Sequence, residues 1–328
     1  MRKASGTDIV RRAAERYGGE FRVAILASLD ELQAALPVET IVRALEEGNA
    51  GDLIRLLAIP VLVVPAAAVL EQMMQSATHA GVNWVLNETG QGTAGPFVID
   101  FAAIDQRASD WAATQWRDLW FGITDEAQQV IRDVVSRAPI EGITYDQQAR
   151  LIRSSLGLTR RQAAGYANRL AALLGRAGVL TGAQMRVQIA RLDRWRARQI
   201  AHRARMIAVN ETRLAALESQ RQAWQAAASH GLLDRATDRV VWVVAEGACD
   251  LCLSLEGTLY GIDDALPKTH PWCHCRTELV FNREKTLVSK PLGRFPDFDA
   301  CVTAMTVKLG SRPAAERYCG ALEQRING

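Results

Sequence analysis

The chain has 328 residues, a length that accommodates two domains. Hydrophobic residues make up 48% of the composition, which excludes a chain that is disordered throughout. The net charge is only +3, but residues 150–205 contain thirteen Arg and a single acid, a local charge of 13 − 1 = +12, so the remaining residues together carry 3 − 12 = −9.

Residues 1–123 are predicted to form an N-terminal helical region. Residues 8–16 have a helical composition, and a second helix is expected to begin near Pro37 and to end at Gly48–Asn49, a pair typical of helix ends. The first residues lack the apolar segment of a secretory signal, so we expect a protein made in the cytoplasm.

The most apolar run, residues 56–70, is too short to span a bilayer and contains Pro60 and Pro65. We interpret it as a buried helix or a packed loop, which predicts a soluble protein without membrane contact. Several glycines then mark residues 86–100 as a loop, and residues 97–101 favour a short strand.

An aromatic-rich segment precedes residue 124. Its large side chains are Trp111, Trp116, Leu119, Trp120 and Phe121. At these spacings we expect them to lie near the end of a helix and to fill a core or an interface rather than bind a ligand.

Residues 124–235 are predicted to form an Arg-rich helical region. Helices are expected to begin at Thr124, Thr144 and Thr159, with the Thr124 and Thr159 side chains as N-terminal caps. Residues 180–229 contain no Pro and read as one long helix of about 45 residues, which spans roughly 65 Å at 1.5 Å per residue.

The positive charge of this region raises the question of nucleic-acid contact. The helix after Thr159 follows a short helix-turn-helix spacing, in which Arg160, Arg161 and Arg169 are the candidate nucleic-acid-binding residues. Because nearly all basic residues of this chain are Arg, the bias also reflects composition. We therefore favour solvated helix faces and protein contacts, with packaged DNA kept as an alternative partner.

The sequence feature with the clearest chemistry lies between Cys249 and Cys275. A C-x-x-C pair, Cys249 and Cys252, is followed by a second group with His270, Cys273 and Cys275. Two short ligand pairs separated by a loop are typical of a structural zinc site. The spacing therefore predicts a structural Zn²⁺ held by four of these five residues.

The spacing does not choose between Cys273 and Cys275. Alternate residues of an extended segment point to opposite faces, so these two share a face and His274 points away as the least suitable ligand. The competing interpretation pairs Cys249 and Cys252 with Cys273 and Cys275 in two disulfides; the lack of a secretory signal argues against it.

Strands are expected on both sides of this motif, over residues 239–244 and 277–281, with a turn and a short strand in residues 255–261. A β unit over residues 236–282 has too small a core to fold alone, so bound metal would contribute to its folding free energy.

Residues 283–328 are predicted to form a linker, over residues 285–296, followed by a C-terminal hairpin of two short helices. Cys301 and Cys319 each lie on an apolar helix face. We expect two packed free thiols there, because a cytoplasmic product is kept reduced.

Residues 200–282, a quarter of the chain, carry a resemblance. They read RMIAVNETRLAALESQRQAW and then VVWVVAEGACDLCLSLEGTLYGIDDALPKTHPWCHCRTELV. The order of a helix, a C-x-x-C, a Leu-Glu-Gly, an acidic loop and a final His-Pro-x-Cys-x-Cys resembles the phage head-morphogenesis domain, the Mu F type of minor capsid protein. Two departures are Glu246-Gly-Ala before the first pair and Cys-His-Cys where the family has Cys-Arg-Cys.

The resemblance implies a structural minor capsid protein of a tailed phage or prophage. Its expected partners are the portal protein and the major capsid or scaffold proteins, and its expected location is the inside of the virion after assembly in the host cytoplasm. The implied role is in head assembly and in DNA retention or delivery.

The predicted fold class is mainly α: an elongated helical protein with a small zinc-stapled α+β module and a short C-terminal helical hairpin. The alternative function is a nucleic-acid-binding zinc module, and within it a nuclease, that acts on packaged DNA. Enzymatic function is not expected. The chain lacks the His-x-Glu of zinc deaminases, the His-Glu-x-x-His of metalloproteases and the phosphate-binding loop of packaging ATPases.

Overall fold

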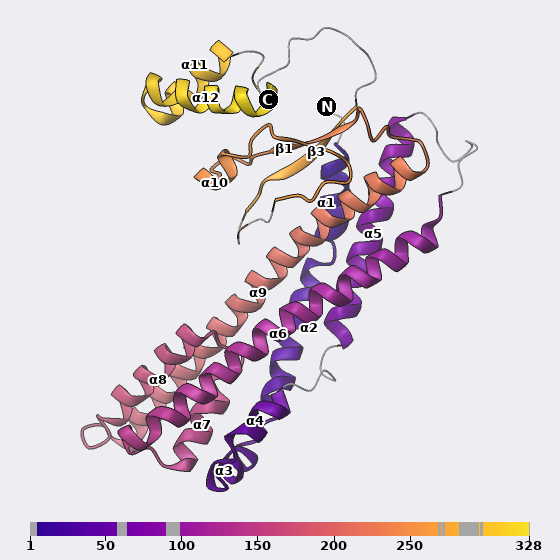
Figure 1. Ribbon diagram of the computed structural model, residues 1–328. Helices are drawn as coiled ribbons and strands as arrows, with labels where there is room; N and C mark the ends of the chain where they lie inside the picture. Colours follow the sequence, from indigo (N-terminus) through magenta and orange to yellow (C-terminus); the bar gives the residue numbers. More distant parts are fainter. Residues whose placement is uncertain are drawn as a thin grey trace. The chain divides into compact units, whose positions relative to one another are not determined.

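A computed structural model describes residues 5–57, 64–89, 99–267, 270, 273–281, 295 and 298–327 (Figure 1). The protein is mainly α-helical, with a small three-stranded antiparallel sheet and a Cys/His cluster beside it, which confirms the predicted mainly α class with a small α+β module. The chain divides into two compact units. Unit 1 comprises Met1–Arg16, Met73–Ala108 and Arg213–Gly328, and unit 2 comprises Tyr17–Gln72 and Ser109–Thr212.

Unit 1 contains the sheet and the C-terminal helices. Its complete elements are α1 (Gly6–Glu15), β1 (Arg239–Val243), α10 (Asp250–Leu253), β2 (Leu259–Tyr260), β3 (Arg276–Val280), α11 (Phe298–Leu309) and α12 (Arg312–Asn327). Unit 2 is helical throughout its described residues. Its complete elements are α2 (Gly18–Ala34), α3 (Val38–Glu46), α4 (Ala50–Leu57), α7 (Tyr145–Ser155) and α8 (Arg160–Leu174).

Three long helices contribute residues to both units. They are α5 (Val64–Glu88), α6 (Phe101–Glu141) and α9 (Gly182–Ser229). The predicted single helix over residues 180–229 is thereby confirmed to within two residues at its start.

Two predicted helix starts are confirmed in atomic detail. The Thr144 and Thr159 hydroxyls each accept a hydrogen bond from the backbone N–H three residues on, at Gln147 and Gln162. Each Gln side chain returns a bond to the backbone N–H of its Thr, which completes a capping box. These local bonds satisfy N–H groups that the first turn of a helix otherwise leaves unpaired.

The predicted helix start at Thr124 is wrong. α6 runs without a break through this residue, and the predicted region boundary between residues 123 and 124 falls inside it. Thr124 is buried, and its hydroxyl donates to the carbonyl of Trp120 within the helix. A Thr can cap a helix or bond back to residue i−4 inside one, and here the buried face of α6 favours the second arrangement.

Two of the five large side chains in the aromatic segment of α6 belong to the core of unit 2, as predicted, whereas Phe121 is 59% exposed, and the segment lies in mid-helix rather than at a helix end. Trp116 and Trp120 are almost fully buried. Their ring centroids are 6.0 Å apart, and Phe21 of α2 meets Trp116 edge-on at the same centroid separation. Aromatic burial of this size contributes strongly to helix packing.

The remaining N-terminal predictions agree with the structure where it describes them. The helices expected over residues 8–16 and after Pro37 occur as α1 and α3. α3 ends before Gly48, which adopts a φ of 70°, a left-handed conformation that glycine adopts readily because it has no Cβ. In the apolar run, residues 58–63 lie outside the described residues, and residues 64–70 belong to α5. Among the described residues, no helix combines the length and the apolarity that crossing a bilayer requires.

The segment between α5 and α6 is described only at its edges. Residues 90–98 lie outside the described residues, so the predicted loop cannot be followed there. Of the predicted strand over residues 97–101, the described part is irregular at 99 and 100 and helical from Phe101, so it contains no strand.

Unit 2 buries one carboxyl group. Glu211 of α9 is 6% exposed, and its Oε2 accepts a hydrogen bond of 2.8 Å from Gln115 Nε2 of α6. Burial raises the pKa of Glu211 to about 7, although the Gln115 bond acts to lower it. This side chain therefore carries a proton in the folded protein at mildly acidic pH.

We expect Glu211→Gln to remove a pH-dependent loss of stability. The pKa of Glu in an unfolded chain is about 4.3, so the folded state holds the extra proton between about pH 4.3 and 7. Over that window the wild-type free energy of unfolding falls as pH rises, by about 4 kcal/mol attributable to Glu211. Urea titrations from pH 4 to 8 measure the difference between the variant and the wild type.

Glu31→Gln is the matched control, because Glu31 is exposed on α2 of the same unit. The difference between the Glu211→Gln and wild-type curves should grow with pH, whereas the Glu31→Gln curve should stay parallel to wild type. A parallel Glu211→Gln curve contradicts the raised pKa.

The sheet of unit 1 has the order β2-β1-β3, and both pairs are antiparallel. Val240 and Trp242 of β1 are buried on one face. Val240 packs with Trp224, Ala227 and other α9 residues in one apolar cluster. The predicted strands over residues 239–244 and 277–281 agree with β1 and β3 to within one residue.

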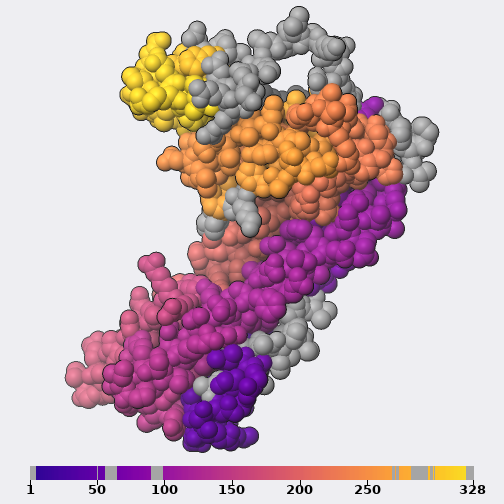
Figure 2. All heavy atoms as spheres, viewed as in Figure 1, coloured from indigo at the N-terminus to yellow at the C-terminus, as the bar shows by residue number. Residues whose placement is uncertain are grey.

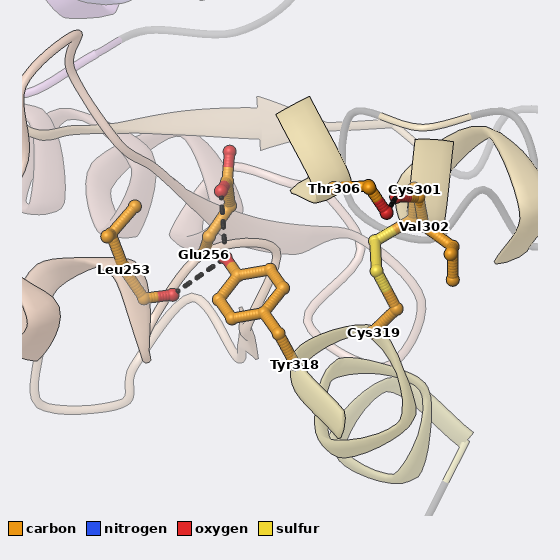
Figure 3. The surroundings of a disulfide bond; sticks show 7 residues. All are labelled: Leu253, Glu256, Cys301, Val302, Thr306, Tyr318 and Cys319. Atoms are coloured by element: carbon orange, nitrogen blue, oxygen red, sulfur yellow. Dashed lines mark hydrogen bonds between the residues drawn. A yellow bond between two sulfur atoms is a disulfide. The ribbon is translucent and has the colours of Figure 1, made fainter. Parts of the chain in front are cut away.

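Beyond the sheet, α11 and α12 form the expected C-terminal helical hairpin. Residues 282–294, which make up most of the predicted linker, lie outside the described residues. Within the hairpin, the structure corrects one cysteine prediction. Cys301 and Cys319 are joined by a disulfide and are not two free thiols (Figure 3). Both are fully buried where the two helices pack, an arrangement that sequence spacing alone does not reveal.

The hairpin contacts the sheet module through Tyr318, the residue before Cys319. Its hydroxyl lies 3.1 Å from the Leu253 carbonyl oxygen and 3.1 Å from Glu256 Oε2 (Figure 3). Leu253 belongs to α10, the short helix that carries part of the Cys/His cluster. The tail thus packs against the element next to the candidate site.

Candidate metal centre

The Cys/His cluster is assembled from two turns, one that follows β1 and one that precedes β3. After β1, Gly247 adopts a φ of 73° in a tight turn that leads to Cys249. Cys249 is the N-cap residue of α10, whose first turn places Cys252 on the same side. On the other side, the Cys273 N–H donates to the His270 carbonyl, and Cys275 directly precedes β3.

The structure brings all five predicted ligands together. His270 Nε2 lies 3.2 Å from Cys249 Sγ and 3.1 Å from Cys252 Sγ. Cys252 Sγ in turn lies 3.4 Å from Cys273 Sγ. Two groups of three donor atoms, each within 4.8 Å of one another, therefore overlap at Cys252: one with Cys249 and His270, the other with Cys273 and Cys275.

These donors suit a soft or borderline metal ion. Zinc–sulfur bonds of about 2.3 Å and zinc–nitrogen bonds of about 2.0 Å in a tetrahedron separate the donor atoms by roughly 3.4–3.8 Å. The three separations given above come within about half an ångström of that spacing. The Cys/His cluster can therefore hold a metal ion, with Cys249, Cys252 and His270 and one or both of the remaining thiols as ligands.

The alternative pairing of these cysteines in disulfides is not present. All four are free thiols, of which Cys249 is exposed and the other three are buried. His274 was predicted to point away from the site because neighbouring residues of an extended segment face opposite sides. In the structure it is exposed and belongs to neither group of donors.

Burial and local hydrogen bonds set the proton affinities of the thiols. Burial raises the pKa of Cys252, and hydrogen bonds with Cys273 and Cys275 act in the same direction. Burial likewise raises the pKa of Cys275. For Cys273, burial acts to raise the pKa, but hydrogen bonds from the Cys275 backbone and Cys252 and the charge of Arg213 lower it overall. A bound cation would displace the remaining thiol protons.

The supporting contacts come from β1 and α9. Trp242 is 1% exposed and packs with Cys252, Cys273 and Cys275 in one buried cluster. Its indole N–H has no acceptor among the residues that the structure describes. From α9, Arg213 donates a 2.7 Å hydrogen bond to the Cys275 carbonyl, which fixes the backbone of the second ligand group.

Two further contacts hold β3 in place, and both were missed by sequence reasoning. The Thr7 hydroxyl at the start of α1 donates to the Thr277 carbonyl, and the Thr277 hydroxyl donates to Gln220 Oε1 of α9. Thr277 lies 270 residues from Thr7. No local pattern signals such a pairing, and the same holds for the Tyr318 contact with α10.

The three candidate nucleic-acid-binding arginines are near one another on α8 but have different surroundings. Arg160 donates two hydrogen bonds, of 2.7 and 2.9 Å, to the carboxylate of Asp133. Arg169 lies over the ring of Trp195 at 4.9 Å from its centroid. Arg161 is exposed and has neither an ion pair nor a ring contact with any described residue. Two of the three thus have intramolecular partners.

Comparisons with family models, with curated proteins and with solved structures each found no match to this chain.

Proposed function

We propose that the Cys/His cluster binds one Zn²⁺ whose role is structural. The observation that carries the proposal is the convergence of one imidazole and four thiols beside a small three-stranded sheet. Thiolate-rich sites with four protein ligands favour zinc and leave no coordination position for a substrate. When bound, the ion supplies folding free energy by joining the turn after β1 to the turn before β3.

We further propose that the chain is a non-catalytic minor capsid protein that acts in phage head morphogenesis. The support is the resemblance over residues 200–282 together with the mainly helical architecture around a small metal module. In this role the expected partners are the portal protein and the capsid or scaffold proteins. DNA retention or delivery is the implied contribution after assembly.

Particle composition tests this role. Mass spectrometry of purified proheads and virions from the phage or prophage that encodes the chain should detect it at low copy relative to the major capsid protein. Deleting its gene should lower the yield of filled heads. Absence of the chain from both particles contradicts the proposal, whatever the metal content of the isolated protein.

The alternative of a DNA-binding zinc module receives less support from the side chains. Besides Arg160 and Arg169, Arg203 is buried and forms an ion pair with Glu126, and Arg196 donates to the Ser154 carbonyl. Arginines held in this way stabilise the helical unit and are less available to phosphates. A steep salt dependence of DNA binding that chelation of the metal abolishes would reverse this preference.

A further inference from the structure

Unlike the arginines discussed above, several arginines of unit 2 have no partner within the chain. Four of them belong to α9, have exposed side chains and form no ion pair with any residue that the structure describes: Arg191, Arg194, Arg198 and Arg205. Arg160 and Arg203 of the same unit are instead paired with Asp133 and Glu126. An exposed guanidinium without an internal partner keeps its charge available to a ligand outside the chain.

The four side chains form one stripe along α9. Together with the exposed His202 they follow one another at steps of three, four, four and three residues, the spacing that places side chains on the same face of a helix. From Arg191 to Arg205 the stripe is about 21 Å long at 1.5 Å per residue. All exposed basic side chains of α9 between residues 190 and 205 thus lie on one face.

Acidic side chains of α9 do not share this face. Between residues 182 and 210 the sequence contains one acid, Asp193. It is five residues from Arg198, a step that rotates the helix by about 140°. Asp193 lies instead on the face of Arg196, three residues further on, whose guanidinium donates to the Ser154 carbonyl of α7. The positive charge of the stripe is therefore not neutralised from within α9.

α8 packs against the same part of α9. Gln162 donates to Gln199, and Arg169 lies over the ring of Trp195. Because the later residue of α8 meets the earlier residue of α9, the two helices are antiparallel. Figure 1 shows α8 alongside the first half of α9, and Figure 2 shows the pink atoms of this part of the chain at one end of unit 2.

This packing places a further arginine beside the stripe. In an antiparallel pair of right-handed helices, the residues that directly precede two contacting residues lie on the same side of the contact. Arg161 precedes Gln162 and Arg198 precedes Gln199, so the exposed Arg161 lies on the side of the stripe. We call the combined surface the basic face; it consists of Arg161, Arg191, Arg194, Arg198, His202 and Arg205.

The side chains between these cations favour phosphates over a protein surface as the ligand. Along α9 from residue 190 to residue 205, the other exposed side chains are Asp193, on a different face, and three alanines, Ala190, Ala197 and Ala201. Protein interfaces are built around aromatic or large apolar anchors, and none is exposed on this stretch. Phosphate binding requires only cations, and the planar guanidinium forms paired hydrogen bonds with phosphate oxygens.

The length and spacing of the stripe suit a nucleic-acid backbone. Each strand of duplex DNA carries one phosphate per 3.4 Å of its axis, so a stripe of about 21 Å runs beside roughly six phosphates. Consecutive cations of the stripe are about 4.5–6 Å apart along the helix, and long flexible side chains can reach successive phosphates from there. Contacts of this kind fix the position of the backbone and carry no sequence information.

We propose that the basic face binds duplex DNA through its phosphates, without sequence preference. The proposal rests on the minor capsid role for the source of the DNA, the packaged genome, and on the side chains of α8 and α9 for the contact. It places the DNA on unit 2, whereas the metal centre belongs to unit 1. The zinc module accordingly keeps a structural role.

Fluorescence anisotropy with the full chain and a labelled duplex of about 20 base pairs tests the proposal. With five arginines available for phosphate contacts, the logarithm of the binding constant should fall with the logarithm of salt concentration with a slope of about −4. Two duplexes of unrelated sequence should bind equally well. A metal chelator should leave the affinity unchanged, because the basic face lies outside the unit that holds the metal centre.

A double variant, Arg194→Gln with Arg198→Gln, removes two adjacent cations of the stripe. The slope should become shallower by about two, and the affinity at 0.1 M salt should fall at least tenfold. The matched control is Arg22→Gln with Arg43→Gln, which removes the same charge from exposed positions of α2 and α3 in the same unit. It should change the affinity less than twofold, and circular dichroism melting verifies that both variants are folded.

Several outcomes would overturn the proposal. One is the lack of DNA binding near physiological salt, and another is equal weakening of binding by the stripe variant and the control. Binding that the chelator abolishes would move the DNA to the zinc module. Stronger displacement of the duplex by a polyglutamate peptide than by unlabelled DNA would assign the basic face to an acidic protein. Particle composition is measured independently, so the minor capsid role and the basic face can fail separately.

Discussion

Replacing Cys252 with Ser is expected to lower the zinc content of the purified chain well below one ion per chain. Cys252 is the one residue common to both groups of donor atoms, so its loss leaves neither group with three ligands. Structural zinc contributes about 10–16 kcal/mol of apparent binding free energy, and in a small module this is also folding free energy. β1 and β3 should then become sensitive to protease, while the circular dichroism of the helices persists.

The matched control is His274→Ala, which removes an exposed imidazole between two candidate ligands but outside both donor groups. It should retain full zinc content by elemental analysis. In the wild type, a chelator should reproduce the effect of Cys252→Ser, whereas a thiol reductant should not. Zinc-free wild-type protein that loses the module under reductant would instead support disulfides among these cysteines.

Trp242→Ala is expected to destabilise the module by about 3–5 kcal/mol, the range for a large aromatic truncated in a packed core. The indole is 1% exposed and lies against three of the candidate ligands. Its loss opens a cavity beside Cys252, Cys273 and Cys275, so these three thiols lose the wall against which they pack. Competition with a colorimetric chelator should therefore show weaker zinc affinity than in the wild type.

Val243→Ala is the comparison for this variant. Val243 is the next residue of β1, points to the opposite face and is only half-buried. Its truncation should cost about 1 kcal/mol or less and should not alter zinc affinity. Equal effects of the two substitutions would show that β1 is needed only as a strand and that the Trp242 side chain does not support the site.

Local signals allowed the sequence to predict much of the module and of the helices. The thiol and imidazole spacing predicted a cluster of five residues that the structure brings together. The β-branched runs located β1 and β3, and the capping residues located α7 and α8. Each of these signals acts between residues that are close along the chain, where backbone geometry alone determines which groups meet.

Where a residue pattern is compatible with two local structures, local signals could not choose between them. Thr124 has the side chain of a helix cap, but it lies inside α6 because Trp120 and Ala127, on the same buried face, pack continuously into the core of unit 2. The competing principle is tertiary burial, which outweighs the preference of Thr for a helix terminus.

Residue type and spacing are enough to predict the candidate metal ligands and the positions of most helices and strands. The disulfide between Cys301 and Cys319, the contact of Tyr318 with α10, and the hydrogen bonds of Thr7 and Gln220 to β3 could be found only in the folded chain. Such contacts join residues distant along the chain, and their partners are specified by the packing of the whole unit.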